Sequence, residues 1–297
     1  EQTRSAIKNN LSDPMIKNIY EEGLNNIAYF QQTYSDYSSS VEYYNELEKI
    51  NLEDKQYERL SRAYYSHAIV LHLIGDYESS IDYSFKYEKL GTQIKDKRIK
   101  SLSKVIIASN YIKMGDPSIG KDILIDMIDD YEKISKTGLD IGSSYYFYLG
   151  KAYLDLGKVD KAIKSLLKFE TLFNKLVQEK SGNEFHLWTV VGKRMAGKTL
   201  LAIAYAKNKN RKESLDIIDS IVSEIKDQPR LFYENSIDIL YNLAEAYEIL
   251  GKLEESKFYY KKALNEMNRI AVYLNNEHRD IFLKNNKINN KMSFPNS

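Results

Sequence analysis

The stretch LYNLAEAYEILGKLEESKFYYKKAL, residues 240–264, decides the fold of this chain. Its apolar residues follow helical spacing up to Gly251, and a second amphipathic segment follows that glycine. Leu243 and Tyr247 fall on one face of the first segment, and Ser256 lies on the apolar face of the second. The stretch therefore predicts two antiparallel helices joined by a tight turn.

The same frame recurs along the chain and is marked by two small residues twelve positions apart. Successive pairs are offset by 40, 40, 42, 52 and 42 residues. The pairs are Ala28/Ser40, Ala68/Ser80, Ala108/Gly120, Gly150/Ala162, Ala202/Ser214 and Ala244/Ser256. Small side chains let two antiparallel helices approach closely about two turns from the turn that joins them. The pattern predicts one helical hairpin repeated six times, which is an all-α solenoid.

The repeats define one elongated domain over residues 12–288. We expect repeats at approximately 21–53, 61–95, 101–136, 143–180, 195–227 and 237–270. Residues 274–288 predict a short closing helix after the last repeat. Residues 1–11 and 289–297 lack the repeat pattern, so we expect two flexible tails. Because the chain opens with Glu1 rather than Met, it is expected to be a processed product or an excerpt of a longer protein.

Local signals mark where the helices begin and end. Glycines in left-handed backbone conformation are expected to end four first helices, at Gly75, Gly115, Gly157 and Gly251. Ser35-Asp36 and Lys209-Asn210 mark the corresponding turns in repeats one and five. The pairs Asp13-Pro14, Asp116-Pro117 and Gln228-Pro229 indicate helix starts, and the two aspartates are predicted N-caps.

One interval between repeats is enlarged. About ten extra residues separate repeats four and five, centred on 180–184. Either the flanking helices are longer there or a loop leaves the edge of the solenoid. Insertions of this kind fall on one face of an array and can be functional.

The repeat pattern resembles the tetratricopeptide repeat family, which places small residues at its eighth and twentieth positions and a glycine near its fifteenth. The resemblance covers roughly residues 20–270. The family's usual period is about 34 residues, whereas the longer period of this chain is similar to the tetratricopeptide-like sensor regions of bacterial signalling and regulatory proteins. The resemblance implies a right-handed superhelix of antiparallel hairpins with a C-terminal capping helix.

The resemblance also implies a binding groove, because the first helices of this family line the concave surface. The groove positions then hold Tyr29, Arg62, Tyr65, Ile69, His72, Lys113, Phe147, Lys151, Ile203, Lys207, Tyr241 and Glu245. This set is aromatic and aliphatic with scattered charge, and it lacks the Lys and Asn set by which chaperone-binding members hold a C-terminal carboxylate. We therefore expect a protein or peptide partner, as an extended segment or an amphipathic helix anchored by apolar side chains.

Composition excludes several other functions. Lys and Arg number 43 and Asp and Glu number 42, so the net charge of +1 gives no field that attracts nucleic acid. The chain has no cysteine, which excludes disulfides and thiol chemistry. It also lacks a run of about 20 apolar residues, so no membrane insertion is expected. With no signal-like segment, these features predict a cytoplasmic scaffold or sensor module.

One motif points to a different function. Residues Gly192 to Thr199 match the phosphate-loop pattern G-x-x-x-x-G-K-[ST], in which Lys198 would reach the phosphates and Thr199 would hold Mg²⁺. Such a loop must lie between a strand and a helix, whereas Ala202 places this segment in the first helix of repeat five. We therefore expect no enzyme and no cofactor, with a nucleotide-binding enzyme as one alternative. A structural oligomerisation spacer is the other.

The remaining polar groups predict no metal site or catalytic set. His67 occupies a core position of its repeat, so it is expected to be a buried histidine with a hydrogen bond. His72 follows five residues later and points to another face, so the two histidines do not form an i,i+4 metal pair. The basic run from Lys95 to Lys100 is expected to be a solvated loop.

Overall fold

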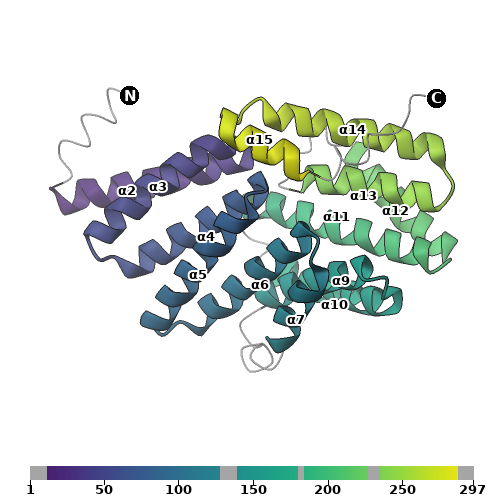
Figure 1. The fold of residues 1–297 in the computed structure, drawn as a ribbon, viewed down its shortest axis with the longest axis horizontal. Coiled ribbons are helices and arrows are strands. Elements are labelled where there is room, and N and C mark those ends of the chain that lie inside the picture. Colours follow the sequence, from purple (N-terminus) through teal and green to yellow (C-terminus); the bar gives the residue numbers. More distant parts are fainter. Residues whose placement is uncertain (1–11, 128–138, 180–183, 227–234, 287–297) are drawn as a thin grey trace.

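The computed structural model describes residues 12–127, 139–179, 184–226 and 235–286, and every regular element within these ranges is an α-helix. The helices are α2 (Pro14–Thr33), α3 (Tyr37–Glu53), α4 (Tyr57–Ile74), α5 (Tyr77–Gln93), α6 (Lys97–Met114), α7 (Pro117–Asp126), α9 (Leu139–Asp155), α10 (Val159–Glu179), α11 (Glu184–Lys207), α12 (Arg211–Lys226), α13 (Ser236–Ile249), α14 (Leu253–Ala271) and α15 (Asn276–Asn285). The first twelve form six hairpins (Figure 1). The predicted all-α solenoid is confirmed. The predicted tails and Gln228-Pro229 lie outside the described residues.

The small residues bring the two helices of a hairpin into contact, as expected. In three hairpins the serine hydroxyl of the pair also donates a hydrogen bond to the carbonyl oxygen of its alanine partner, at 2.9 Å for Ser40 and Ala28, 2.7 Å for Ser80 and Ala68, and 2.9 Å for Ser214 and Ala202. At Gly120, a Cβ atom would lie 2.7 Å from the Ala108 carbonyl oxygen. Larger side chains would force the helix axes apart.

The turns follow the sequence signals. The four glycines expected to end first helices all have positive φ angles, between 69° and 98°. Ser35 and Lys209 adopt the same left-handed conformation in the two hairpins that lack a glycine, with φ angles of 67° and 63°. This conformation satisfies the last carbonyls of each first helix and reverses the chain within two or three residues.

The helix starts follow the sequence signals with one correction. The Asp13 carboxylate accepts hydrogen bonds from the backbone N–H groups of Met15 and Ile16, as predicted. Asp116 is the N-cap of α7 with Pro117 at the first helical position, also as predicted, although its side chain makes no capping hydrogen bond. The basic run from Lys95 is not a loop throughout, because the Asp96 carboxylate caps α6 and the helix begins at Lys97.

The enlarged interval is taken up by longer helices. The helices α10 and α11, which flank it, contain 21 and 24 residues. The helix α11 begins at Glu184, well before the predicted repeat boundary at 195. Of the two possibilities left open by the sequence, longer helices account for the interval, and only residues 180–183 between them lie outside the described ranges.

The last helix of the array returns to its first hairpins, which the repeat pattern did not predict. The helix α15 packs against α14 and also against α4 (Figure 1). The Ser38 hydroxyl of α3 accepts a hydrogen bond from the Asn275 backbone N–H at 3.0 Å and lies 2.9 Å from His278 Nδ1. The Asn285 side chain donates to the Gly75 carbonyl oxygen at 2.9 Å. The solenoid is thereby closed on itself.

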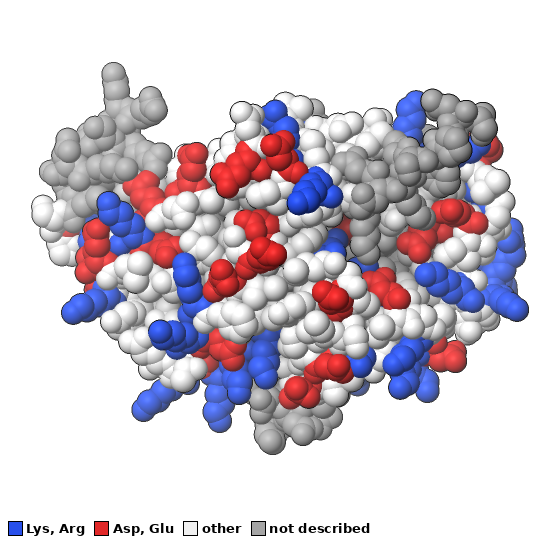
Figure 2. All heavy atoms as spheres, viewed as in Figure 1, with Lys and Arg blue, Asp and Glu red and all other residues white. Residues whose placement is uncertain are grey.

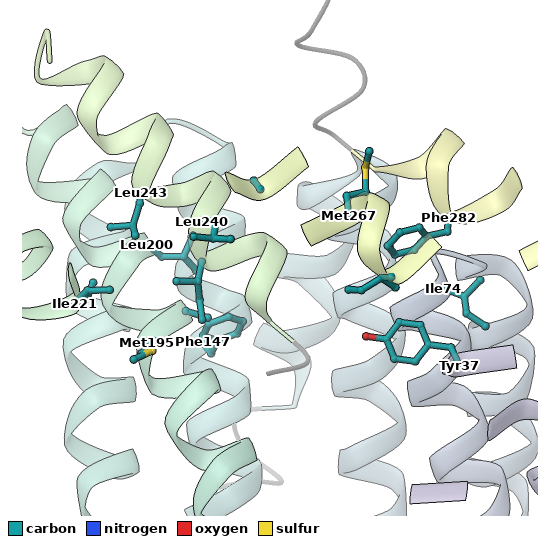
Figure 3. Packing of buried hydrophobic residues seen from close by; sticks show 14 of the residues in the cluster. Tyr37, Ile74, Phe147, Met195, Leu200, Ile221, Leu240, Leu243, Met267 and Phe282 are labelled. Atoms are coloured by element: carbon teal, nitrogen blue, oxygen red, sulfur yellow. The ribbon is translucent and has the colours of Figure 1, made fainter. Parts of the chain in front are cut away.

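An apolar contact completes this closure. Phe282 of α15 is 5% exposed and lies between Met267 of α14 and Ile74 of α4, with Tyr37 of α3 nearby (Figure 3). These four side chains belong to one continuous core that also contains the interior of the last three hairpins. The closing helix predicted from 274–288 therefore exists, but it covers the last hairpin and the first two together.

One core prediction is wrong in detail. His67 is buried, but its Nδ1 atom has no hydrogen-bond partner, because the nearest carboxylate oxygen, of Glu48, is 3.9 Å away. Its ring instead packs against Tyr83, with the ring centroids 4.0 Å apart. Ile27, which occupies the equivalent position in the first repeat, is exposed.

The surface carries both signs of charge. Figure 2 shows lysine and arginine interspersed with aspartate and glutamate on the face displayed, in keeping with the net charge of +1. Among the helices described, none has the length and apolarity required to cross a membrane.

Candidate functional site

The array surrounds a partly open cavity of about 540 Å³. Its walls come mainly from the first helices of the hairpins, α2, α4, α6, α9, α11 and α13, and α15 contributes Phe282 and Asn285. A volume of this size falls within the roughly 300–1,000 Å³ of small-ligand pockets. Because α15 joins the two ends of the array, the concave groove expected from the sequence becomes a cavity that remains partly open.

The structure brings together nearly all the residues predicted for the groove. Those that line the cavity are Tyr29, Tyr65, Ile69, His72, Lys113, Phe147, Lys151, Ile203, Lys207, Tyr241 and Glu245. Arg62 is the exception, since it is exposed and lies beside Glu21 and Glu22 in a small surface depression between α2 and α4. The part of α4 that lines the cavity begins at Tyr65, so the Arg62 side chain, nearly one turn earlier, does not reach it.

Aromatic rings of the cavity wall are held by second helices. Tyr65 packs against Tyr87 of α5, and Tyr241 packs against Tyr260 of α14, with ring centroids 5.5 Å apart in each pair. Phe147 packs edge to face against a phenylalanine of α10 at the same distance. Rings fixed in this way offer apolar surface to a ligand without losing side-chain entropy on binding.

An ion pair spans the cavity wall between hairpins three and six. The Lys113 ammonium of α6 donates to both carboxylate oxygens of Asp238 of α13, at 2.8 and 2.7 Å. Burial disfavours charge on both groups, but their mutual attraction outweighs it, so the pKa of Lys113 is raised and the pKa of Asp238 is lowered. Both residues stay charged at neutral pH.

His72 lies next to this pair and is held neutral. Burial, reinforced by the nearby Lys113 charge, lowers the pKa of His72 to about 4. Its Nδ1 atom lies 2.6 Å from the Asn110 side-chain oxygen, which fixes the ring in place. At neutral pH the imidazole therefore offers a ligand hydrogen-bonding groups and no charge.

The other charged groups of the cavity are also paired with one another. Lys151 lies 3.2 Å from Asp155 within α9, and Lys207 of α11 lies 3.5 Å from Glu245 of α13. The Lys193 ammonium donates to the Ser144 hydroxyl at 2.6 Å. The cavity thus combines apolar rings with polar groups of both charges, which can orient a ligand that carries its own donors and acceptors.

Asp238 and the α15 residues were not among the predicted site residues. Asp238 occupies the second position of repeat six, the register that placed Arg62 in the predicted groove, so the same rule applied to repeat six would have found it. Phe282 and Asn285 gave no such signal, because α15 lies outside the repeat frame. Their position depends on contacts with residues more than 200 positions away.

The phosphate-loop motif is not a loop. Gly192 to Thr199 lie inside α11, where their backbone N–H groups belong to a continuous helix. A Cβ atom at Gly197 would lie 2.1 Å from the Phe169 ring, and the Thr199 hydroxyl is buried and donates to the Ala196 carbonyl oxygen at 2.8 Å. Close packing between α10 and α11 explains this glycine, so the nucleotide-binding alternative loses its structural basis.

The described residues contain no group of three or more histidine, aspartate or glutamate side chains placed to hold a metal ion. His67 and His72 point to different faces of α4, as their spacing predicted. His67 packs against Tyr83 of α5, whereas His72 faces Asn110 of α6 in the cavity.

Comparisons with known proteins agree on the architecture. A family model described as tetratricopeptide repeat matches residues 143–175 and 237–266. No curated protein matches the sequence. Among solved structures, a Rap protein complexed with Competence and Sporulation Factor is similar over 92% of this chain and 81% of that one, with a TM-score of 0.62 and 12% identity. Tetratricopeptide-like repeats of a putative kinesin light chain from Podosopora anserina cover 69% of this chain and 92% of that one, with a TM-score of 0.46 and 17% identity.

Proposed function

We propose that this chain, a tetratricopeptide-repeat protein by its sequence and its fold, is a receptor that binds an extended peptide in the cavity closed by α15. The observation that supports the proposal is the convergence of all six first helices on one partly open cavity. Tyr29, Lys113 and Ile203, from three different hairpins, line the same cavity. A binding surface assembled from successive repeats is how solenoid proteins recognise extended partners.

The lining of the cavity suits an extended peptide. An extended segment can place alternate side chains against the rings of Tyr65 and Tyr241. Its backbone groups can pair with polar side chains of the wall, which include Gln32 and Asn235.

The polar groups of the wall are suited to orienting a ligand. Lys113 and Asp238 neutralise each other, and Lys151 and Lys207 are paired with Asp155 and Glu245. The chain acts alone or as the sensor module of a larger bacterial regulator. The Rap protein of similar fold was solved in complex with a factor, which gives a precedent for a ligand-bound module of this architecture.

Selection from a library of random heptapeptides displayed on phage tests the proposal. Purified chain should enrich a family of peptides that then bind in solution as fluorescent synthetic peptides. The variant Tyr65→Ala with Tyr241→Ala should weaken that binding by roughly tenfold or more, because two aromatic anchors are lost. Phe85→Ala, on the outer face of α5, serves as the matched control and should bind as the wild type does. Unchanged binding by a folded Tyr65/Tyr241 variant would contradict the proposal.

A further inference from the structure

The wall of the cavity is charged on one side only. Among the lining residues that the structure describes, the charged ones all belong to the first helices of hairpins three to six. They are Lys113 of α6, Lys151 and Asp155 of α9, Lys193 and Lys207 of α11, and Asp238 and Glu245 of α13. The described lining residues from hairpins one and two, α14 and α15 include no lysine, arginine, aspartate or glutamate. The cavity therefore has a charged half and an uncharged half.

The two halves lie on opposite sides of the array. Figure 1 shows hairpins one and two on the left and hairpins five and six on the right, with α6 between them. The contacts between helices follow the same order, because α4 packs against α6, α6 against α9, and α11 against α13. Lys113 of α6 lies close enough to His72 of α4 to act on its charge, so α6 marks the boundary. A ligand that spans the cavity meets both halves.

The uncharged half is built from aromatic and aliphatic side chains. Tyr29, Tyr65, Ile69 and Phe282 line it, and its polar groups are neutral ones such as the Ser66 hydroxyl. The titratable side chain at its boundary, His72, is neutral at physiological pH because burial lowers its pKa to about 4. A charged group of a ligand would lose its water here without meeting an opposite charge, which is unfavourable.

The helices of the uncharged half do carry charged residues, but these lie on other faces. Glu21 of α2 pairs with Arg59 of α4, and Lys17 of α2 pairs with Asp54, which follows α3. Arg62 of α4 lies in the surface depression outside the cavity. The register of α2 and α4 thus turns charge away from the cavity and turns rings toward it.

The charged half can accept ligand charges of either sign. Its pairs Lys113–Asp238, Lys151–Asp155 and Lys207–Glu245 place an ammonium next to each of these carboxylates. The six side chains keep between 16% and 46% of their surface exposed. An incoming carboxylate or ammonium can therefore join a pair and find its opposite charge there, which offsets the loss of its water.

We propose that the peptide bound in this cavity is amphiphilic along its length. Its uncharged aromatic or aliphatic side chains lie against α2, α4 and α15, and its charged side chains lie against α9, α11 and α13. This inference rests on the proposed function, since it names the class of peptide that the same cavity selects. It adds that the cavity excludes charge at one end of the peptide and accepts it at the other.

A charge scan of a bound peptide tests this inference. The tightest heptapeptide from the phage selection is synthesised with an acetylated N-terminus and an amidated C-terminus, so that only side chains carry charge. Each position is replaced in turn by lysine and by glutamate, and binding to the wild-type chain is measured by calorimetry. Both replacements should weaken binding by roughly tenfold or more at adjacent positions of one end, and by less than about threefold at the other end.

A charge added to the protein shows which half excludes charge. Ser66 is half-buried on the wall of the uncharged half, so Ser66→Asp places a carboxylate there. It should restore the binding of the weakened lysine peptides by roughly tenfold and weaken the corresponding glutamate peptides further. Ser223→Asp is the matched control, because Ser223 is exposed on α12 and does not line the cavity. It should leave both sets of peptides unchanged, and circular dichroism checks the fold of both variants.

The outcomes separate this inference from the proposed function. Equal losses at both ends of the peptide, or equal rescue by Ser66→Asp and Ser223→Asp, would overturn the inference while leaving peptide binding in place. Failure of every selected peptide to bind the wild-type chain would overturn the proposed function and this inference with it. The scan uses the wild-type chain, so its result stands even if Ser66→Asp does not fold.

Discussion

At its C-terminal end the array covers its last second helix, α14, with α15, whereas at its N-terminal end α2 exposes positions that are buried in the later repeats. Leu243 is 0% exposed and Ile27 is 44% exposed, although both are aliphatic residues at the same position of the repeat. The neighbouring helix, and not the residue type, decides burial in a solenoid. The comparison also shows that one short helix, α15, has two structural roles. It caps the last hairpin, and it converts the groove into a cavity.

The largest expected effect is a difference in the free energy of unfolding between alanine variants of two phenylalanines at opposite ends of the array. Phe282→Ala should lower the free energy of unfolding by about 3–5 kcal/mol, because the side chain is buried where α15 meets α4 and α14. Phe30→Ala should change it by no more than about 0.5 kcal/mol, because the side chain is exposed. Urea unfolding of the two variants measures both values. Similar losses at the two ends would show that α15 does not close the array.

A pH-dependent effect is expected at the position that Ile27 occupies in the first repeat. Burial, with added repulsion from the Lys86 and His278 charges, lowers the pKa of His67 to about 4. Between pH 6.5 and 4 the unfolded chain binds a proton that the folded chain does not, so stability is fully present above pH 6.5 and falls as the pH drops toward 4. His67→Leu removes this loss, which amounts to about 3 kcal/mol at pH 4.

The equivalent residues Ile107, Leu149 and Leu201 show that an aliphatic side chain fits this position of the repeat. Urea unfolding of His67→Leu and wild type at pH 7 and pH 4.5 measures the difference. The variant should gain stability relative to wild type at the lower pH, while the remaining acid sensitivity includes that of His72, whose pKa is also lowered. Parallel pH profiles for the two proteins would contradict the assignment of a neutral buried histidine.

The smallest expected effect concerns the polar contact between the two ends. Ser38→Ala removes the hydroxyl that accepts from the Asn275 backbone N–H and contacts His278. The loss should be about 1 kcal/mol, since a backbone donor and an imidazole lose one partner each. Ser39→Ala, one residue along the same helix, is the control. A melting temperature that falls no further for Ser38→Ala than for Ser39→Ala would show that the Ser38 hydroxyl does not stabilise the closure.

The sequence predicted what depends on local spacing. The pairs of small residues located six hairpins, and the repeat register found most side chains of the cavity, including Tyr65 and Lys113. It also placed Thr199 in a helix, against its match to a phosphate loop. These features follow from helical periodicity and from the close approach of two helices. Both are determined by the sequence of a single repeat of about 40 residues.

What the sequence missed depends on contacts between distant parts of the chain. The closure joins Ser38 to His278, and no repeat pattern connects residues so far apart. Arg62 was assigned to the groove because register alone does not say how far the cavity extends along α4. The missing hydrogen bond of His67 Nδ1 has the same origin, since the position of Glu48 depends on how two hairpins pack.

Site-specific photo-crosslinking tests the central claim, that the closed array binds its ligand inside the cavity. p-Benzoylphenylalanine is placed at position 65 or 241, in the cavity, or at position 85, on the outer face, and the protein is irradiated in its native cells before mass spectrometry. The account predicts peptide adducts at positions 65 and 241 and none at position 85. Adducts at position 85 with none at 65 or 241 would contradict it.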